Sequence, residues 1–124
     1  VRAKAALAAW ATQHGKPVVS VGAAGGKTQP HRVEVADLAD VTHDPLLSSV
    51  RQRLRQRHSA ARKGRLGVTC VFSREPVLPP QDSCEVAPGG DGSLNCHGYG
   101  SSVTVTATFG MVAAAEMLNR LIGS

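Results

Sequence analysis

The chain has 124 residues, enough for one domain of ordinary size. Its composition, 42% hydrophobic and 19% charged, is that of a globular protein and excludes an intrinsically disordered one. The net charge of +5 is concentrated in one place: seven of the 14 basic residues fall within residues 51–65, and no Asp or Glu occurs between Asp44 and Glu75. This concentration indicates an anionic partner.

Aromatic residues make up only 3% of the chain, so the core must be built from Ala, Val and Leu, which favours helices packed on a β-sheet. No stretch reaches the ~20 apolar residues that span a bilayer. The chain starts without an initiator Met or a signal peptide, so we expect an internal piece of a longer protein. Cys70, Cys84 and Cys96 form no CxxC pair, which disfavours a disulfide framework and a zinc site and favours a reducing cytoplasm.

Residues 2–14 are predicted to form a helix, which Gly15 and Pro17 end. Its expected inner face consists of residues spaced by three or four: Ala3, Leu7, Trp10, Ala11 and His14. Two short strands are predicted next, at 17–21 and 32–35. Because a short turn joins them, we expect an antiparallel component in the sheet.

The turn between these strands contains the glycine run 22–26, followed by Lys27 and Thr28. A phosphate-binding loop needs four residues between its first Gly and the Gly-Lys pair, and a helix directly after it. Here only three residues separate Gly22 from Gly26, and a strand is predicted to follow. A glycine-rich turn is therefore the better interpretation.

A second helix is predicted to start at Asp44, with the Asp side chain as N-cap and Pro45 in the first turn. Its apolar stripe is Leu46, Leu47, Val50 and Leu54. A buried strand at 67–72 follows, then a Pro- and Gly-rich segment at 75–102, which we expect to be a mobile loop, and a final helix at 103–122. The predicted order, α-β-β-α-β-loop-α, is that of an α/β fold.

The basic residues of the second helix and of the segment after it are the first candidate site. Arginines at i and i+4 repel one another, and no acidic residue in the helix relieves them. A solvated helix face usually mixes both signs of charge, so we favour a contact with a polyanion, most naturally the phosphate backbone of RNA. The candidate residues are Arg51, Arg53, Arg55, Arg57, Arg62, Lys63 and Arg65.

Cys96 is the candidate catalytic residue. It lies in the loop beside His97 and ahead of the last helix, where neighbouring positive charge would favour the thiolate. The alternative is an incidental surface thiol. The five histidines show no metal-ligand spacing, so we expect no metal site in this chain.

Several blocks, in this order, resemble one family: VRAKAAL at 1–7, PVV at 17–19, GAAGG at 22–26, VADLA at 35–39, DPL at 44–46, KGRLGVTCVFS at 63–73 and VTVTATFG at 103–110. Together they are similar to the C-terminal half of the bacterial tRNA threonylcarbamoyladenosine dehydratases, in the HesA/MoeB/ThiF superfamily. The resemblance implies the C-terminal half of a single adenylating domain over 1–124. It also implies a Rossmann-like fold, related to ubiquitin-activating enzymes, with helices flanking a mixed sheet.

The resemblance also implies a function. The family uses ATP and Mg²⁺ to activate and cyclise threonylcarbamoyladenosine beside the anticodon of tRNA, with net loss of water. It is typically a cytoplasmic homodimer that partners a cysteine desulfurase and a SufE-type sulfur acceptor. Its nucleotide and metal sites lie in the N-terminal half, so we expect no cofactor site here and no activity from this chain alone. Cys96 falls at the position of the superfamily's crossover-loop cysteine.

Two alternatives from other classes remain open at this point. One is adenylation of a sulfur-carrier protein, as in MoeB and ThiF relatives, with Cys96 as the acceptor. The paired CxxC motifs usual in those relatives are absent here, which favours the dehydratases. The other alternative is a non-catalytic module for RNA binding or dimerisation.

Overall fold

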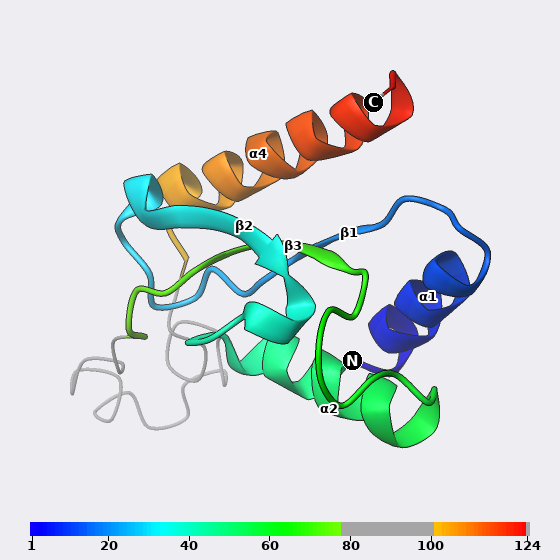
Figure 1. Cartoon of the computed structure of the whole chain (residues 1–124). Helices are drawn as coiled ribbons and strands as arrows, with labels where there is room; N and C mark the ends of the chain where they lie inside the picture. Colours follow the sequence, from blue (N-terminus) through cyan, green and yellow to red (C-terminus); the bar gives the residue numbers. More distant parts are fainter. Residues whose placement is uncertain (78–100, 124) are drawn as a thin grey trace.

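The computed structural model of the chain describes residues 1–77 and 101–123. These residues form three layers (Figure 1). Helix α4 (Val103–Leu121) covers one face of a three-stranded sheet, and helices α1 (Arg2–Gln13) and α2 (Pro45–Arg57) cover the other. The predicted α/β fold, with helices flanking a mixed sheet, is confirmed.

The sheet consists of β1 (Val19–Val21), β2 (Val33–Asp37) and β3 (Thr69–Ser73), in the order β1-β3-β2. An antiparallel component is present, but it joins β2 to β3. The expectation that the first two strands are partners is wrong, because β3 lies between them and pairs in parallel with β1. The connection from β1 to β2 is too long for a tight hairpin and includes a 3₁₀ turn at Pro30–Arg32.

The central strand β3 is buried at every position because both faces of the sheet are covered. Alternate side chains enter opposite layers, as the two-residue period of a strand requires. Cys70 and Phe72 pack with the apolar residues of α1 and α2, whereas Val71 packs with Val105 and Phe109 of α4. A central strand covered on both faces reads as a continuous apolar run, which is how its sequence predicts it.

Helix α1 lies where it was expected, but its inner face differs from the prediction. The buried residues are alanines: Ala5, Ala8, Ala9 and Ala11. Leu7 and Trp10 are 63% and 50% exposed. Small side chains let α1 pack closely against α2 and the sheet, so the larger residues are turned outward, where the Trp10 ring stacks on His14 at 4.5 Å.

Helix α2 begins as predicted. The Oδ1 atom of Asp44 accepts a hydrogen bond from the Leu47 amide at 3.0 Å, and Pro45 occupies the first turn. Leu47, Val50 and Leu54 are buried, and Leu46 is half-buried. The expected stripe therefore anchors α2 and leaves its arginines on the flanks.

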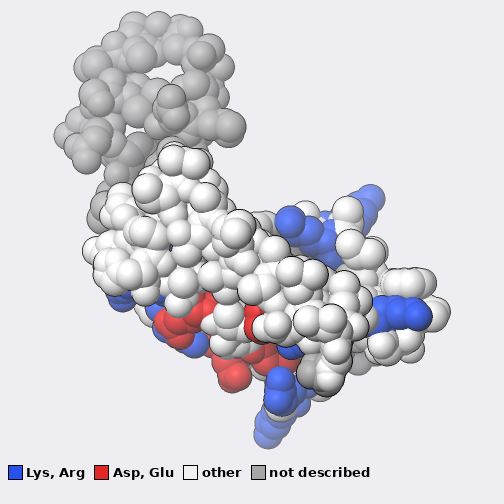
Figure 2. Space-filling view, turned by 90° about the horizontal axis from the view of Figure 1, so that it is seen from above, with Lys and Arg blue, Asp and Glu red and all other residues white. Residues whose placement is uncertain are grey.

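Helix α4 confirms the predicted last helix, with Ser102 as its N-cap. Leu118 and Leu121 are 59% and 66% exposed, because the inner stripe of the helix passes through Val105 and Phe109. Seen from the α4 side, the molecule shows a broad surface without charge (Figure 2). In the part of the chain that the structure describes, no helix is both long and apolar enough to cross a membrane.

Candidate functional site

The seven basic residues predicted to bind RNA lie on α2 and on the segment between α2 and β3. Arg57, Arg62, Lys63 and Arg65 are exposed, while Arg51, Arg53 and Arg55 are half-buried. All seven therefore lie within one stretch of the chain, but they differ in exposure. Their difference lies in what each guanidinium already binds.

Arg51 and Arg55 are held in place by main-chain carbonyls. Nη1 of Arg51 donates to the carbonyls of Leu38 and Val41, at 2.9 Å each, and Nε of Arg55 donates to the carbonyl of Ala61 at 3.0 Å. Carbonyls are neutral acceptors, so both side chains keep their positive charge while their directions are fixed. A fixed guanidinium loses less entropy when it binds a phosphate.

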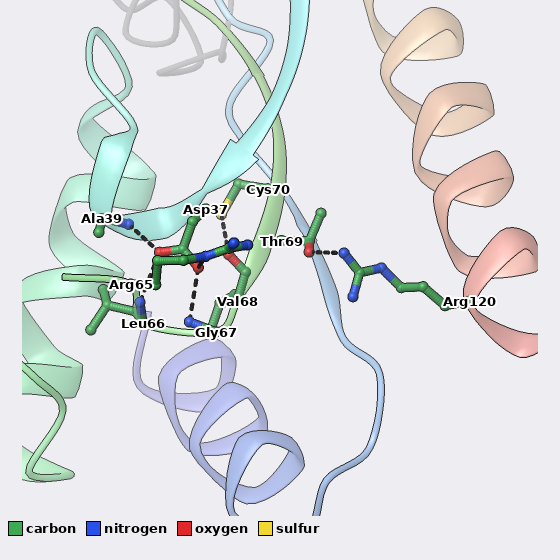
Figure 3. Close-up of polar contacts among 9 residues, drawn as sticks. All are labelled: Asp37, Ala39, Arg65, Leu66, Gly67, Val68, Thr69, Cys70 and Arg120. Atoms are coloured by element: carbon green, nitrogen blue, oxygen red, sulfur yellow. Dashed lines mark hydrogen bonds and ion pairs between the residues drawn. The ribbon is translucent and has the colours of Figure 1, made fainter. Parts of the chain in front are cut away.

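Arg65 belongs to a short segment organised by Asp37 at the end of β2 (Figure 3). The Asp37 carboxylate accepts hydrogen bonds from the amides of Leu66 and Gly67 at 2.8 Å each, and from that of Ala39 at 2.9 Å. Burial opposes the charged form, but these amides and Arg65, 4.0 Å away, outweigh it and lower the pKa of Asp37. The charged aspartate thus ties the basic segment to the sheet.

A shallow pocket of about 360 Å³ lies along the outer side of α2. Its lining combines hydroxyl, amide and guanidinium groups: Ser48, Arg51, Gln52, Arg55, Gln56 and Arg62. A second pocket, of about 460 Å³, continues from Ser48 and Arg51, which line both. Its other lining residues are Val41, Thr42, His43, Asp44, Pro45, Pro76 and Val77.

The second pocket lies close to the carboxyl ends of the parallel strands β1 and β3, where α/β folds generally place their ligands. Gly22 follows β1 at this edge. A Cβ atom there would come within 2.0 Å of Oδ2 of Asp44, which accepts the Ala23 amide at 2.9 Å. A glycine is therefore required where the turn after β1 meets the start of α2.

Lys27 is a structural brace at this edge. Its side chain is buried, and Nζ donates to the carbonyls of His43 and Ser73, at 3.0 and 2.6 Å. Burial lowers its pKa, although the negative charges of Asp44 and Glu75 oppose the shift. The turn leads into a 3₁₀ turn and β2 instead of an α-helix. Lys27 is committed to main-chain carbonyls, which agrees with the interpretation of 22–28 as a glycine-rich turn.

Glu75 lies at the same edge of the sheet, where it binds the chain after the glycine-rich turn. Its carboxylate accepts the amides of Thr28 and Gln29, both with a contact at 2.9 Å. Burial opposes ionisation, but the bonds from these amides and from the Thr28 hydroxyl lower its pKa. The sequence carries no signal for this role, because the contacts join residues 46 and 47 positions apart.

Cys96, with its neighbour His97, lies outside the described residues, so its candidate role stays a prediction. Within residues 1–77 and 101–123, no cluster of three His, Cys, Asp or Glu side chains could hold a metal ion. The polar residues Ser48, Gln52 and Gln56 are site residues that the sequence analysis missed. Their spacing of four, which places them on one helix face beside the arginines, was the available signal.

The mixed sheet with helices on both faces is in line with the ThiF/MoeB-like α/β fold, and the solved structures that it matches carry this assignment. The crystal structure of the E. coli tRNA N6-threonylcarbamoyladenosine dehydratase TcdA matches 98% of this chain with a TM-score of 0.81 and 39% identity, over 45% of that chain. The structure of the same enzyme in complex with ATP matches with a TM-score of 0.75 and 36% identity, covering 96% of this chain and 43% of that one.

Curated sequences agree. The tRNA threonylcarbamoyladenosine dehydratase of Escherichia coli is 38% identical over 98% of this chain, and that of Haemophilus influenzae is 33% identical over 98%. The chain spans about half of their length, 48% and 47%. No model of a known protein family matches it. The family resemblance is thus confirmed: the chain is a relative of the C-terminal half of the tRNA threonylcarbamoyladenosine dehydratases.

Proposed function

We propose that this chain is the C-terminal half of an ATP-dependent enzyme that dehydrates threonylcarbamoyladenosine beside the anticodon of tRNA. The observation that carries the proposal is the 38% identity to the Escherichia coli dehydratase over 98% of the chain, supported by the match in fold. The active enzyme would pair this half with a nucleotide-binding half, as the length of the relatives suggests.

In this enzyme the chain contributes a surface for tRNA. The support is a run of seven basic residues on and after α2, in a stretch of sequence that has no Asp or Glu between Asp44 and Glu75: Arg51, Arg53, Arg55, Arg57, Arg62, Lys63 and Arg65. Phosphate contacts release counterions and supply sequence-independent affinity. Helix α2 contains no aromatic residue on which a base could stack, so we expect contacts with phosphates and sugars to dominate.

ATP and Mg²⁺ are assigned to the other half. The solved relative binds AMP and ATP, according to the structures of those complexes. Lys27, the lysine that follows the glycine run, is used on main-chain carbonyls and does not face a phosphate site. ATP supplies a good leaving group on the substrate carboxylate, so that intramolecular attack closes the ring with net loss of water.

The remaining features of the proposal come from the family. The enzyme acts in the cytoplasm as a homodimer with ligase-type activation chemistry, and it works with a cysteine desulfurase and a SufE-type sulfur acceptor. The homodimer has one further support, the uncovered apolar surface of α4. Cys96 is the proposed catalytic residue at the crossover-loop position.

The experiment that tests the function uses the protein with both halves, ATP, Mg²⁺ and tRNA carrying threonylcarbamoyladenosine. The tRNA is digested and its nucleosides are weighed by mass spectrometry. We expect an ATP-dependent nucleoside lighter by one water. Absence of this product, with exchange of pyrophosphate into ATP retained, would overturn the proposal in favour of activation of a sulfur-carrier carboxylate.

The same assay with Cys96→Ser tests the proposed catalytic residue. We expect loss of cyclisation if the thiol forms a covalent intermediate. Full cyclisation by the variant would remove Cys96 from the mechanism and leave the dehydratase assignment intact.

A further inference from the structure

The two pockets on α2 lie side by side, because Ser48 and Arg51 line both, and together they hollow the outer side of the helix. We call this surface the α2 groove. It begins at the pocket of about 460 Å³ near the carboxyl ends of β1 and β3, lined by His43 and Pro76, which we call the strand-end pocket, and it extends along the outer side of α2 to Arg62. We propose that the α2 groove holds a single strand of tRNA, with backbone phosphates on Arg55 and Arg62, and leads it toward the strand-end pocket. This inference rests on the proposed function, since it names the path of that substrate.

The chemistry of the lining fits a sugar-phosphate backbone. Arg55 and Arg62 offer the forked donors that suit phosphate oxygens. Gln52, Gln56 and Ser48 are exposed on the same side of α2 and can donate to or accept from the 2′-hydroxyl of a ribose. The mixture of fixed positive charge with neutral polar groups is what a strand bound by its backbone requires.

The size of the groove favours one strand. Ser48 to Gln56 spans about 12 Å along the helix axis, at about 1.5 Å per residue. The pocket of about 360 Å³ has room for a local stretch of one sugar-phosphate backbone. The substrate nucleoside beside the anticodon lies in a loop of tRNA, so an unpaired strand is the form in which it would arrive.

Arg51 sits where the two pockets meet and is suited to steering the strand. Its guanidinium is tied to the carbonyls of Leu38 and Val41, so its charge cannot move away from the junction. Asp44 lines the strand-end pocket, but its carboxylate already accepts the amides of Ala23 and Leu47. The fixed guanidinium of Arg51 therefore extends the positive charge of the groove as far as the junction.

A steric test distinguishes binding of tRNA in the groove from general electrostatic attraction to the surface. Ser48→Trp fills the junction without changing the charge of the full chain, and Ser49→Trp places the same side chain on a neighbouring exposed position that lines neither pocket. We expect Ser48→Trp to weaken binding of unmodified tRNA by roughly fivefold or more. Ser49→Trp should bind as the parent does. If the two variants bind tRNA equally well and melt at the same temperature, the proposal that the groove binds tRNA is wrong.

A charge test measures which arginines touch phosphates. Arg55→Gln and Arg62→Gln should each reduce the slope of log affinity against log salt by about one, and lower affinity roughly fivefold at low salt. Arg2→Gln, an exposed arginine on α1 outside the groove, is the matched control and should leave the slope unchanged. If all three substitutions changed the affinity and the salt slope by the same small amount, the attraction would come from net charge alone. This outcome would contradict the proposal.

The two proposals fail in different ways. If the groove variants bind tRNA normally while the enzyme still forms the dehydrated nucleoside, the groove is wrong and the function stands. If they lose tRNA binding but no dehydrated nucleoside forms in any preparation, the groove stands and the function is wrong.

Discussion

Asp37 illustrates how one carboxylate organises the basic segment of this protein. It joins the end of β2 to the amides of Leu66 and Gly67, directly after the exposed Arg65. No role for Asp37 is predicted from the sequence, because its partners lie 29 and 30 residues away. Hydrogen bonds to an ionised group are the stronger ones, so this contact is a sensitive point of the fold.

Replacement of Asp37 by Asn keeps the shape of the side chain. However, only one oxygen then remains to accept hydrogen bonds from the three amides that bind the carboxylate. We expect Asp37→Asn to lower the free energy of unfolding by about 2–3 kcal/mol, as for other hydrogen bonds to charged groups. Asp40→Asn, at an exposed position in the adjacent 3₁₀ turn, should change it by less than ~0.5 kcal/mol. Urea unfolding measures both, and equal effects would contradict the role of Asp37.

The lowered pKa values of Asp37 and Glu75 predict that the folded protein loses stability at acid pH. In each case the unfolded chain binds its proton at a higher pH than the folded protein, so the stabilisation is complete above the ordinary value, 4.5 for Glu75. It is lost as the pH falls through the lowered value. Glu75→Gln should therefore be less stable than the parent at pH 6, with a smaller difference at pH 3. A constant difference in the urea midpoint would contradict this linkage.

Cys70 is fully buried in β3, and burial raises the pKa of its thiol to about 12. The thiolate is the reactive form, so we expect Cys70 to resist alkylation at pH 8 in the folded protein. Mass spectrometry after treatment with iodoacetamide should find this cysteine modified only when denaturant is present. Rapid labelling of Cys70 without denaturant would show that β3 opens readily.

Helix α4 carries apolar residues on both its covered and its exposed sides. Val105 and Phe109 pack on the sheet, while Met111 and Leu118 remain 72% and 59% exposed. Contiguous apolar surface of this kind usually marks an interface. The sequence predicted the helix but not which of its faces would be covered, since an apolar residue on either face satisfies the pattern.

If α4 forms the proposed homodimer interface, Met111→Glu should disrupt it. We expect the dimer to be weakened by more than tenfold, about 1.4 kcal/mol or more, because a charge would be buried in an apolar contact. Leu7→Glu is the matched control, since Leu7 is a similarly exposed apolar residue of α1, on the opposite layer. Light scattering during gel filtration gives the mass. A monomeric parent, or equal loss with both variants, would exclude this interface.

For the molecule as a whole, the relatives are about twice as long, and the glycine turn of this chain is braced by Lys27. We therefore expect these 124 residues alone not to hydrolyse ATP or exchange pyrophosphate, while still binding tRNA. The protein with both halves serves as the positive control under the same conditions. ATP turnover by the isolated chain would contradict the assignment of the nucleotide site to the other half.

The sequence alone determined the elements and the family of this protein. Local signals were sufficient for both: Asp44 and Pro45 mark the start of α2, the apolar run at β3 marks a buried strand, and the spaced motifs carry the resemblance. The basic segment was equally visible, because charge is a property of composition.

Only the tertiary structure decided which residues meet. It placed β3 between β1 and β2, turned the alanines of α1 inward, and committed Lys27 to carbonyls at a strand edge. It also joined two pockets at Ser48 and Arg51. Such contacts depend on packing between segments far apart in the chain, where volume and hydrogen-bond geometry select one arrangement among many that local patterns allow.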